Sequence, residues 1–314
     1  MPADPLSSWK ESAARERLLD FVKRVTVNEA PDFVPPGDRI AVFDNDGTLW
    51  PEQPNCIQFI FAFDRLKSLA RVNPGTRNME PFRTILEGGF DRLATLEANE
   101  IIEMIKVTQS GMSTEQFSVI VAEWLVTAKD PRFGRAYTEL VYQPMMELLD
   151  FLRANEFKIF IVSGTGADFI RVFAEETYRI PPEQVVGSIT VTEFKAGKAG
   201  PVLMKMPEVE ILRNGPGKPE AIERFIGRRP IFAFGNSDGD KEMLEWTAAG
   251  LGLRFVGLLH HTDAKREWAY DRHAKVGRLD KALDRARAED WTIVDMATDW
   301  NIVFPFQRDI AGTL

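Results

Sequence analysis

Short runs of apolar residues along the chain predict buried β-strands. The expected strands cover residues 39–43, 158–162, 185–192, 231–234, 253–259 and 292–295. Such runs, about four to eight residues long and bounded by turn residues, are typical of a parallel sheet that is covered on both faces. Segments with helical spacing lie between most of them. The alternation of strand and helix therefore predicts an α/β protein with a doubly wound parallel sheet.

The stretch between about residues 56 and 130 has a different pattern, because helical periods dominate it and no convincing strand pattern interrupts them. Ser113 and Gln116 form the sequence signature of a capping box at the start of its last helix. We expect an all-helical module inserted after the first strand. The predicted helices of this module cover residues 56–72, 81–90, 95–109 and 113–128. Farther along, residues 195–207 are rich in Gly, Lys and Pro and predict a loop or a β-excursion.

Composition and charge restrict the class of protein. The chain has 314 residues, 44% of them hydrophobic and 27% charged, which predicts a globular protein with a sizeable core. Its net charge of -8 argues against a nucleic-acid or membrane-surface partner. One cysteine excludes an internal disulfide. Since no apolar run is long enough to span a membrane and the first residues lack signal-peptide features, we expect a cytoplasmic protein. The oligomeric state stays open.

Two aspartates follow the first predicted strand, at the edge of the sheet where ligands bind in open α/β folds. A carboxylate such as Asp44 can attack phosphorus, and a second one such as Asp46 can hold a proton and donate it to a leaving group. Two acids also attract a divalent cation. The alternative is an Asx-turn that ends the strand, with Gly47 in a left-handed conformation.

Further polar groups follow other strands. Ser163 and Gly164 end the second strand, where the hydroxyl and nearby N–H groups can hold phosphoryl oxygens or simply cap a helix. Lys218 opens a helix, where a cation is unfavourable to the helix dipole unless an anion lies nearby. A solvated surface lysine is the alternative. The acidic loop 236–240 can supply the second half of a metal site or a polar loop with a helix cap.

These residues together resemble the haloacid dehalogenase superfamily. The sequence Asp44-Asn45-Asp46-Gly47-Thr48-Leu49 resembles its motif I, Ser163 resembles motif II, Lys218 motif III and residues 235–240 motif IV, in the family's order. The resemblance covers about residues 39–259. It implies a Rossmann-like core with a helical cap similar to that of phosphoserine-phosphatase-like members. The expected divisions are 1–37 for an N-terminal helix and linker, 38–50 plus 141–314 for the core, and 51–140 for the cap.

The resemblance implies a Mg²⁺-dependent hydrolase of small phosphomonoesters that works through an aspartyl-phosphate. It makes Asp44 the nucleophile and Asp46 the acid and base, while Ser163, Gly164 and Lys218 would bind the phosphoryl group. Mg²⁺ would take the Asp44 carboxylate, the Asp46 backbone carbonyl and a side chain of motif IV. Because Asn stands at the position of the usual first Asp of that motif, the expected ligand is Asn236 with Asp240 in support, and Asp238 is the alternative.

Other residues give weaker expectations about the substrate. Glu52 stands where phosphoserine-phosphatase-like enzymes bind a substrate amine, and Trp50 beside it makes an amine or choline-like head group conceivable. A solvated carboxylate is the alternative for Glu52. His260 and His261 follow the fifth strand and either face the site or are satisfied by the loop backbone. Residues 266–287 mix charges of both signs and predict a solvated helical face.

Two other functions remain possible from the sequence. Residues 235–239 match the G-x-S-x-G pattern of a serine hydrolase, with Ser237 as nucleophile and Asp263 and His273 as the rest of a triad. That reading leaves Asp44, Asp46 and Lys218 unexplained. The other alternative is a non-catalytic protein that keeps the fold for binding a phospho-ligand.

Overall fold

The computed structural model describes residues 4–197, 200–210 and 214–307. Within them, an eight-stranded sheet has the order β4-β3-β2-β1-β5-β6-β7, with β8 paired to β6. β4 is antiparallel to β3, β7 is antiparallel to β6, and the other neighbouring pairs are parallel. This confirms the predicted fold class. The strands are β1 (Ile40–Phe43), β2 (Lys158–Gly166), β3 (Val185–Gly197), β4 (Gly200–Glu210), β5 (Phe232–Gly235), β6 (Phe255–Thr262), β7 (Ala269–Tyr270) and β8 (Thr292–Asp295).

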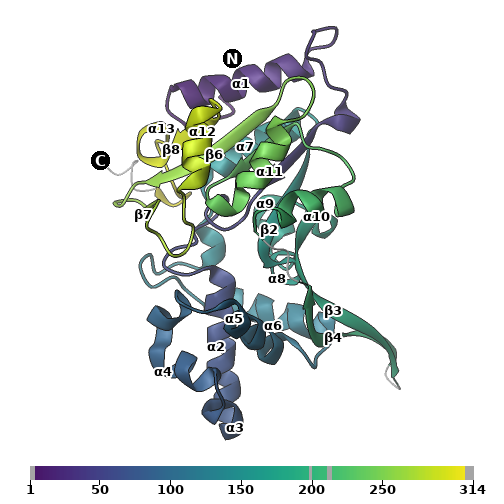
Figure 1. The fold of residues 1–314 in the computed structure, drawn as a ribbon, viewed down its shortest axis with the longest axis vertical. Helices are drawn as coiled ribbons and strands as arrows, with labels where there is room; N and C mark the ends of the chain where they lie inside the picture. The colour runs from purple at the N-terminus through teal and green to yellow at the C-terminus, as the bar shows by residue number, and fades with distance from the viewer. Residues whose placement is uncertain (1–3, 198–199, 211–213, 308–314) are drawn as a thin grey trace.

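Helices cover both faces of the sheet, as the continuous apolar strands require (Figure 1). In β1, Ala41 and Phe43 pack into one apolar cluster, while Ile40 and Val42 pack into the cluster of the opposite face. The first face is covered by α1 (Ala13–Thr26), α7 (Gln143–Ala154), α8 (Ala167–Ile170), α9 (Ala174–Tyr178) and α13 (Met296–Asp299). The second is covered by α10 (Gly217–Phe225), α11 (Lys241–Ala248) and α12 (Lys281–Ala288).

The predicted cap range contains five helices, which gather at one end of the molecule in Figure 1. They have an apolar cluster of their own that includes Phe63, Leu66 and Met104. The capping box is confirmed, because the Gln116 backbone N–H donates to Ser113 Oγ at 3.2 Å and the Ser113 N–H donates to the Gln116 side chain at 2.9 Å. The helices are α2 (Ile57–Val72), α3 (Pro74–Asn78), α4 (Phe82–Leu93), α5 (Ala98–Gln109) and α6 (Thr114–Thr127). The exact domain boundaries stay a prediction, and residues 1–3 and 308–314 lie outside the described part.

The β3–β4 hairpin joins the core to these helices, and it corrects the expectation of a strand that ends at residue 192. Its two strands pair from Ile189 and Glu210 out to Gly197 and Gly200. The Gly111 N–H donates to the Lys205 carbonyl, and the Lys205 N–H donates to the Met112 carbonyl, both at 2.9 Å. The expected β-excursion is therefore a hairpin arm, visible beside α6 in Figure 1. Residues 198–199 of that prediction lie outside the described part.

Three other expectations about element ends need correction. β2 continues past Ser163 because Gly166 still pairs with Ser188 of β3. β6 continues through His260 and His261 because β8 and β7 supply their backbone partners. Much of 266–287 is loop rather than the expected helical face.

The two ends of the described chain pack together on the core. The Lys10 N–H donates to the Asp299 carbonyl at 2.7 Å, and the Asn301 N–H donates to the Ser8 carbonyl at 2.8 Å. The rings of Trp9 and Trp300 meet edge to face. None of the described helices has the length and apolar character needed to cross a bilayer.

Candidate active site

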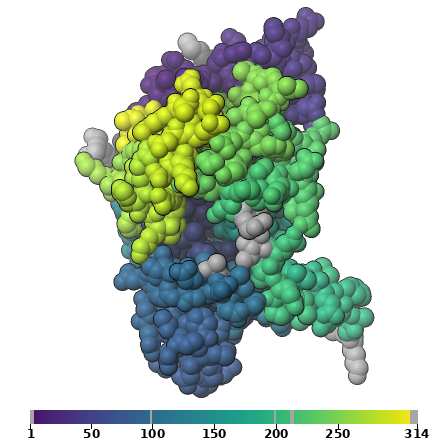
Figure 2. Space-filling model, in the orientation of Figure 1, coloured from purple at the N-terminus to yellow at the C-terminus, as the bar shows by residue number. Residues whose placement is uncertain are grey.

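A cavity of about 410 Å³ lies where the carboxyl ends of the strands meet the cap helices. Figure 2 shows a hollow between the blue cap helices and the green and yellow part of the core. Five of the site residues predicted from the sequence line this cavity: Asp44, Asp46, Glu52, Ser163 and Gly164. Residues from β2, α2, α5, the β3–β4 hairpin and the loop around residue 276 complete its wall.

Lys218 joins Asp44 to Asp240 beneath the cavity. Its ammonium donates to Asp44 Oδ1 at 2.7 Å and to Asp240 Oδ1 at 2.6 Å. Lys218 is 1% exposed, so the solvated-lysine alternative is wrong. Burial opposes the charge of Lys218, but Asp240 and Asp44 hold its pKa above the ordinary value. Burial and the charge of Asp240 raise the pKa of Asp44 to about 7, although Lys218 works in the opposite direction.

Asp46 is held by hydrogen bonds at both carboxylate oxygens. The Trp50 indole N–H donates to Oδ1 at 2.8 Å, and the Thr165 hydroxyl donates to Oδ2 at 2.5 Å. Burial raises the pKa of Asp46, and these two hydrogen bonds offset part of the rise. A carboxyl whose pKa is raised in this way suits proton donation near neutral pH.

The end of β2 presents small polar groups to the cavity. Ser163, Gly164 and Thr165 all line it, and Ser163 is 1% exposed. Ser163 Oγ accepts a hydrogen bond from the Thr165 N–H at 3.1 Å. Ser163 does not cap the helix, since Gly166 occupies the N-cap position of α8.

The polar side chains of the acidic loop after β5, residues 236–240, have different partners. Both oxygens of Asp240 have protein partners, since Oδ2 accepts from the backbone N–H groups of Asn236 and Ser237 at 3.0 Å. Asp238 points elsewhere, because its Oδ1 accepts from the N–H groups of Asp280 and Ala282 at the start of α12. Asn236 is fully buried, and of the three predicted motif IV groups it is the one bonded to Glu52.

Glu52 is a buried member of the site and not a solvated carboxylate. Its Oε1 accepts from Asn236 Nδ2 at 2.5 Å and from the Tyr270 hydroxyl at 2.9 Å. Burial, followed by the charges of Asp44 and Asp46, raises the pKa of Glu52 well above its usual value. The expectation for Trp50 is wrong: it is fully buried, bonds Asp46 and stacks on Phe173, so it presents no face to a substrate cation.

His260 and His261 make different contacts. His261 is 2% exposed, and its Nε2 donates to the backbone carbonyl of Gly47 at 2.7 Å, since a carbonyl can only accept. Its Nδ1 lies 3.1 Å from Glu267 Oε2. His260 points toward Asp271, at 3.5 Å. Thus His261 supports the loop that carries Asp46, and neither histidine lines the cavity.

Several site residues escaped the sequence analysis. Thr165 stands next to the predicted pair 163–164, and its hydroxyl gave no separate signal. Tyr270 and the loop at Val276 and Gly277 belong to residues 266–287, which we expected to be a solvated face; that expectation is wrong because this segment folds back over Glu52. A Cβ on Gly277 would lie 1.9 Å from Glu52 Oε1, so the absent side chain marks a close approach that one sequence cannot reveal.

The serine-hydrolase triad is not assembled. The Ser237 hydroxyl donates to Asp240 at 3.2 Å, and the Asp263 carboxylate bonds Arg266. His273 is exposed, and nothing in the described part of the chain joins it to Ser237 or Asp263. The G-x-S-x-G match therefore reflects the loop after β5 and not a nucleophile elbow.

Among the described residues, no three His, Cys, Asp or Glu side chains form a group that could hold a metal ion. The ligand set expected from the resemblance is of another kind. It combines Asp44 with an amide oxygen of Asn236 and a backbone carbonyl of Asp46, with Asp240 in support.

Comparison with known proteins identifies the family. The sequence model of the haloacid dehalogenase-like hydrolases matches residues 41–245, well over half of the chain. This protein therefore belongs to the haloacid dehalogenase-like hydrolase family. No curated protein matches it.

Solved structures agree at the level of the fold. A conserved protein of unknown function from Anaerococcus prevotii DSM 20548 matches with a TM-score of 0.56 and 15% identity, over 90% of this chain and 90% of that chain. A protein of unknown function from Bordetella pertussis Tohama I matches with a TM-score of 0.53 and 14% identity, over 82% of this chain and 98% of that chain. At such identities the likeness concerns the fold alone.

Proposed function

We propose that this hydrolase is a Mg²⁺-dependent phosphatase that acts on a small phosphomonoester through an aspartyl-phosphate. The observation that carries the proposal is the position of Asp44. It directly follows β1 and lines the cavity, its Oδ1 is bonded to the buried ammonium of Lys218 at 2.7 Å, and a second aspartate stands two residues further on. Oδ2 has no hydrogen-bond partner among the described residues, which leaves it available for attack.

Two steps follow from this arrangement. An oxygen of Asp44 attacks phosphorus, the bond from phosphorus to the leaving oxygen breaks, and Asp46 gives its proton to that oxygen. Asp46, now ionised, takes a proton from water, and the resulting hydroxide attacks phosphorus and displaces the Asp44 carboxylate. The raised pKa of Asp46 supports its first role, and the hydrogen bonds from Trp50 and Thr165 keep its carboxylate oriented for both.

We assign binding of the phosphoryl group to the residues around Asp44 and Asp46. Ser163 and Gly164 supply small polar groups at the end of β2, and Lys218 supplies the positive charge. Asp240 keeps Lys218 in place by pairing with it from the opposite side. Because Asp44 lines the cavity and is bonded to Lys218, a phosphoryl oxygen bound beside Asp44 would lie near this ammonium.

The residues present fit a Mg²⁺ ion. Asp44, Asp46, Glu52 and Asp240 are all buried in one site, and the buried ammonium of Lys218 pairs with two of them, Asp44 and Asp240. Burial, followed by the charges of Asp240 and Asp46, raises the pKa of Asp44, and a divalent cation would offset this penalty on its ionised form. Asp44, the Asp46 carbonyl and Asn236 would hold the ion, which when bound would offset the charge of the phosphoryl group.

The substrate is proposed to be a small phosphorylated metabolite. An amine or choline-like head group keeps one supporting feature, the Glu52 carboxyl in the cavity wall. Against it, Oε1 of Glu52 is already bonded twice and Trp50 does not face the cavity. Phosphocholine and phosphoserine therefore belong in the substrate screen.

The test is hydrolysis of p-nitrophenyl phosphate with Mg²⁺, with EDTA, and by the Asp44→Asn variant. We expect EDTA to abolish turnover and Asp44→Asn to lower kcat at least about a thousandfold. Asp238→Asn is the matched control, since it makes the same chemical change in a residue that caps α12. Rapid quenching with ³²P-labelled substrate should trap a phosphoprotein that hydroxylamine cleaves, as an acyl phosphate requires.

Two results would contradict the proposal. Turnover that survives EDTA would contradict the proposed dependence on Mg²⁺. An Asp44→Asn variant as active as Asp238→Asn would contradict the role of Asp44 as nucleophile. Phosphate binding without any turnover of a broad ester panel would favour the non-catalytic alternative.

A further inference from the structure

One face of α5 lies along the cavity. Ile101, Ile105 and Gln109 are spaced four residues apart, which places them on the same side of the helix, and all three line the cavity. Met104 and Thr108 turn away and are fully buried in the cap. The helix therefore presents two branched apolar side chains and one amide to the space that also contains Asp44.

The two isoleucines are not core residues of the cap. Met104 belongs to the apolar cluster of the cap helices, whereas Ile101 and Ile105 belong to none of the three clusters in the described chain. Ile105 is nevertheless only 9% exposed. Its side chain is thus withdrawn from bulk solvent without packing into a core, which is the environment of a residue that covers a ligand.

Other apolar groups extend this wall. Phe59 of α2 lines the same cavity, as do Ile189 and Val209 at the base of the β3–β4 hairpin. None of these side chains is charged, so a charged group buried among them would lose its hydration without compensation. Apart from Asp44, Asp46 and Glu52, the charged residues that line the cavity are Asp168, which pairs with Lys205, and Lys275. The apolar part of the wall therefore favours an uncharged, apolar occupant.

Gln109 adds one polar requirement. It is 3% exposed, and its Nε2 has no acceptor among the described residues. A buried donor without an acceptor costs free energy, and a ligand oxygen in the cavity can remove that cost. The amide closes the apolar stripe of Ile101 and Ile105 at the C-terminal end of α5.

We propose that this wall, Phe59, Ile101, Ile105 and Gln109, binds the leaving group of the substrate, and that the leaving group is uncharged, apolar and carries a hydrogen-bond acceptor. An aryl or branched alkyl group with one ether, hydroxyl or carbonyl oxygen has this chemistry. The assignment rests on the proposed function, since it takes the phosphoryl group to lie at Asp44. A cavity of about 410 Å³ has room for a group of that size.

Affinity for non-hydrolysable phosphonates tests the apolar wall without requiring turnover. Calorimetry with Mg²⁺ present should find phenylphosphonate bound at least about tenfold more tightly than methylphosphonate. Ile105→Ser and, separately, Ile101→Ser should reduce that ratio several-fold while leaving methylphosphonate affinity unchanged. Val119→Ser, on the exposed surface of α6, is the control and should keep the full ratio.

Gln109 is tested by a second pair of ligands. 4-Acetylphenylphosphonate should bind more tightly than phenylphosphonate to the unchanged protein, and Gln109→Leu should abolish that difference while keeping the preference for phenyl over methyl. Loss of both preferences in Gln109→Leu would mean that the residue only supports the helix.

Failure of the inference and failure of the proposed function are distinguishable. Equal affinity for phenyl- and methylphosphonate, or preferential hydrolysis of phosphocholine over phenyl phosphate, contradicts the proposal that this wall binds an uncharged, apolar leaving group. Tight binding of phenylphosphonate together with no hydrolysis of any phosphomonoester contradicts the proposed phosphatase activity and still supports binding of an apolar group by this wall.

Discussion

The imidazole of His261 lies 2.7 Å from the backbone carbonyl of Gly47, the residue that directly follows Asp46. His261 comes from β6, far along the chain from β1, and its other ring nitrogen contacts the buried Glu267. Glu267 is itself held by the Tyr142 hydroxyl at 2.9 Å. A buried side-chain network therefore fixes the loop on which the proposed acid and base stands.

This network predicts different outcomes for two substitutions of His261. Gln can place its amide nitrogen near the position of Nε2 and keep the bond to Gly47, so His261→Gln should retain most activity. Asn reaches only the position of Nδ1, so His261→Asn should lower kcat about 10- to 100-fold, the cost of a small displacement of catalytic groups. Steady-state kinetics should show the loss in kcat, with the inhibition constant of inorganic phosphate little changed.

The control is His260→Asn, the same change at the neighbouring residue, which lies toward Asp271 and not toward the loop that carries Asp46. It should leave kcat unchanged. Equal losses in His261→Gln and His261→Asn would mean that the bond to Gly47 is not what positions the loop.

Thr165 gives a prediction about pH dependence. Its hydroxyl donates to Asp46 Oδ2 at 2.5 Å and so lowers the pKa of that carboxyl. Thr165→Val keeps the shape of the side chain and removes the donor, so the pKa of Asp46 should rise. The limb of the pH–rate profile on which Asp46 must be ionised should then move to higher pH. Thr190→Val, also in the cavity wall, should leave the profile in place.

The sequence predicted the site better where chemistry concentrates in a short motif than where it depends on packing. Asp44, Asp46 and Lys218 were found because acids at a strand end and a lysine at a helix start are locally unusual. Tyr270 and Gly277 were missed, since their approach to Glu52 arises only when the segment after β6 folds back over the cap side of the core. Trp50 only made a cationic head group conceivable, and the sequence cannot tell which way such a large side chain turns.

The fold shows the same division. Buried strands were found wherever they form continuous apolar runs, as in β1 and β5. The sequence does not decide between a loop and a β-excursion for the outer part of the β3–β4 hairpin, because much of its surface is exposed. Hydrophobic periodicity reflects burial, so an exposed arm gives a weak signal.

Crowded carboxylates predict how metal-free protein responds to pH. The pKa of Asp44 is raised to about 7, above the value of roughly 3.9 in an unfolded chain. Its contribution to stability is therefore present at low pH and lost as pH rises through about 7. Burial shifts Asp46 and Glu52 in the same direction. In EDTA, the melting temperature should fall between pH 5.5 and 8.

Mg²⁺ should reverse this trend, because a cation that binds the ionised carboxylates stabilises the folded state most at high pH. Thermal melts with and without Mg²⁺ across that pH range measure both effects. Asp44→Asn removes one titrating group and should flatten the slope in EDTA. A metal-free melting temperature that rises from pH 5.5 to 8 would contradict the crowding argument.

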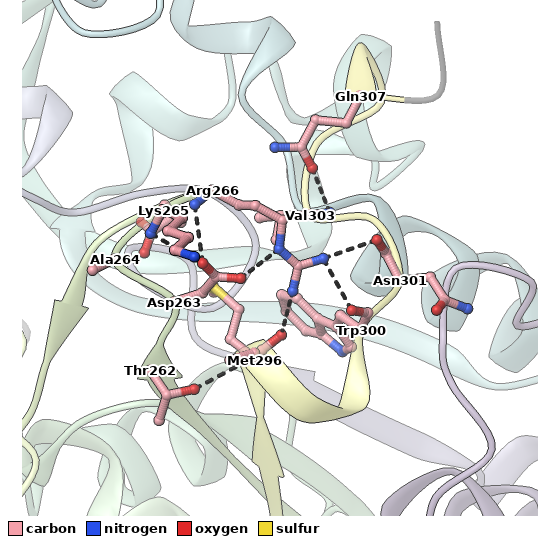
Figure 3. A network of polar contacts seen from close by, with 12 residues as sticks. Thr262, Asp263, Ala264, Lys265, Arg266, Met296, Trp300, Asn301, Val303 and Gln307 are labelled. Atoms are coloured by element: carbon pink, nitrogen blue, oxygen red, sulfur yellow. Dashed lines mark hydrogen bonds and ion pairs between the residues drawn. The ribbon is translucent and has the colours of Figure 1, made fainter. Parts of the chain in front are cut away.

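Substitution of Arg266 should lower the stability of the protein without lowering its catalytic rate, because the contacts of Arg266 lie away from the cavity (Figure 3). Its guanidinium pairs with Asp263 and donates to the backbone carbonyls of Met296 and Trp300 at 3.0 Å and Asn301 at 2.8 Å. Arg266→Met keeps the apolar stem but leaves these partners without a donor, so it should lower the free energy of unfolding by about 2–3 kcal/mol. Urea denaturation measures the change.

Arg17→Met is the matched control for this substitution. Arg17 pairs with Asp290 on the exposed surface, where an ion pair contributes at most about 1 kcal/mol. Because Arg266 holds the C-terminal segment and touches no cavity residue, kcat of Arg266→Met at a temperature where it is folded should equal that of the unchanged protein. A lowered kcat with unchanged stability would instead mean that the segment after β6 transmits its position to Tyr270 and through it to Glu52.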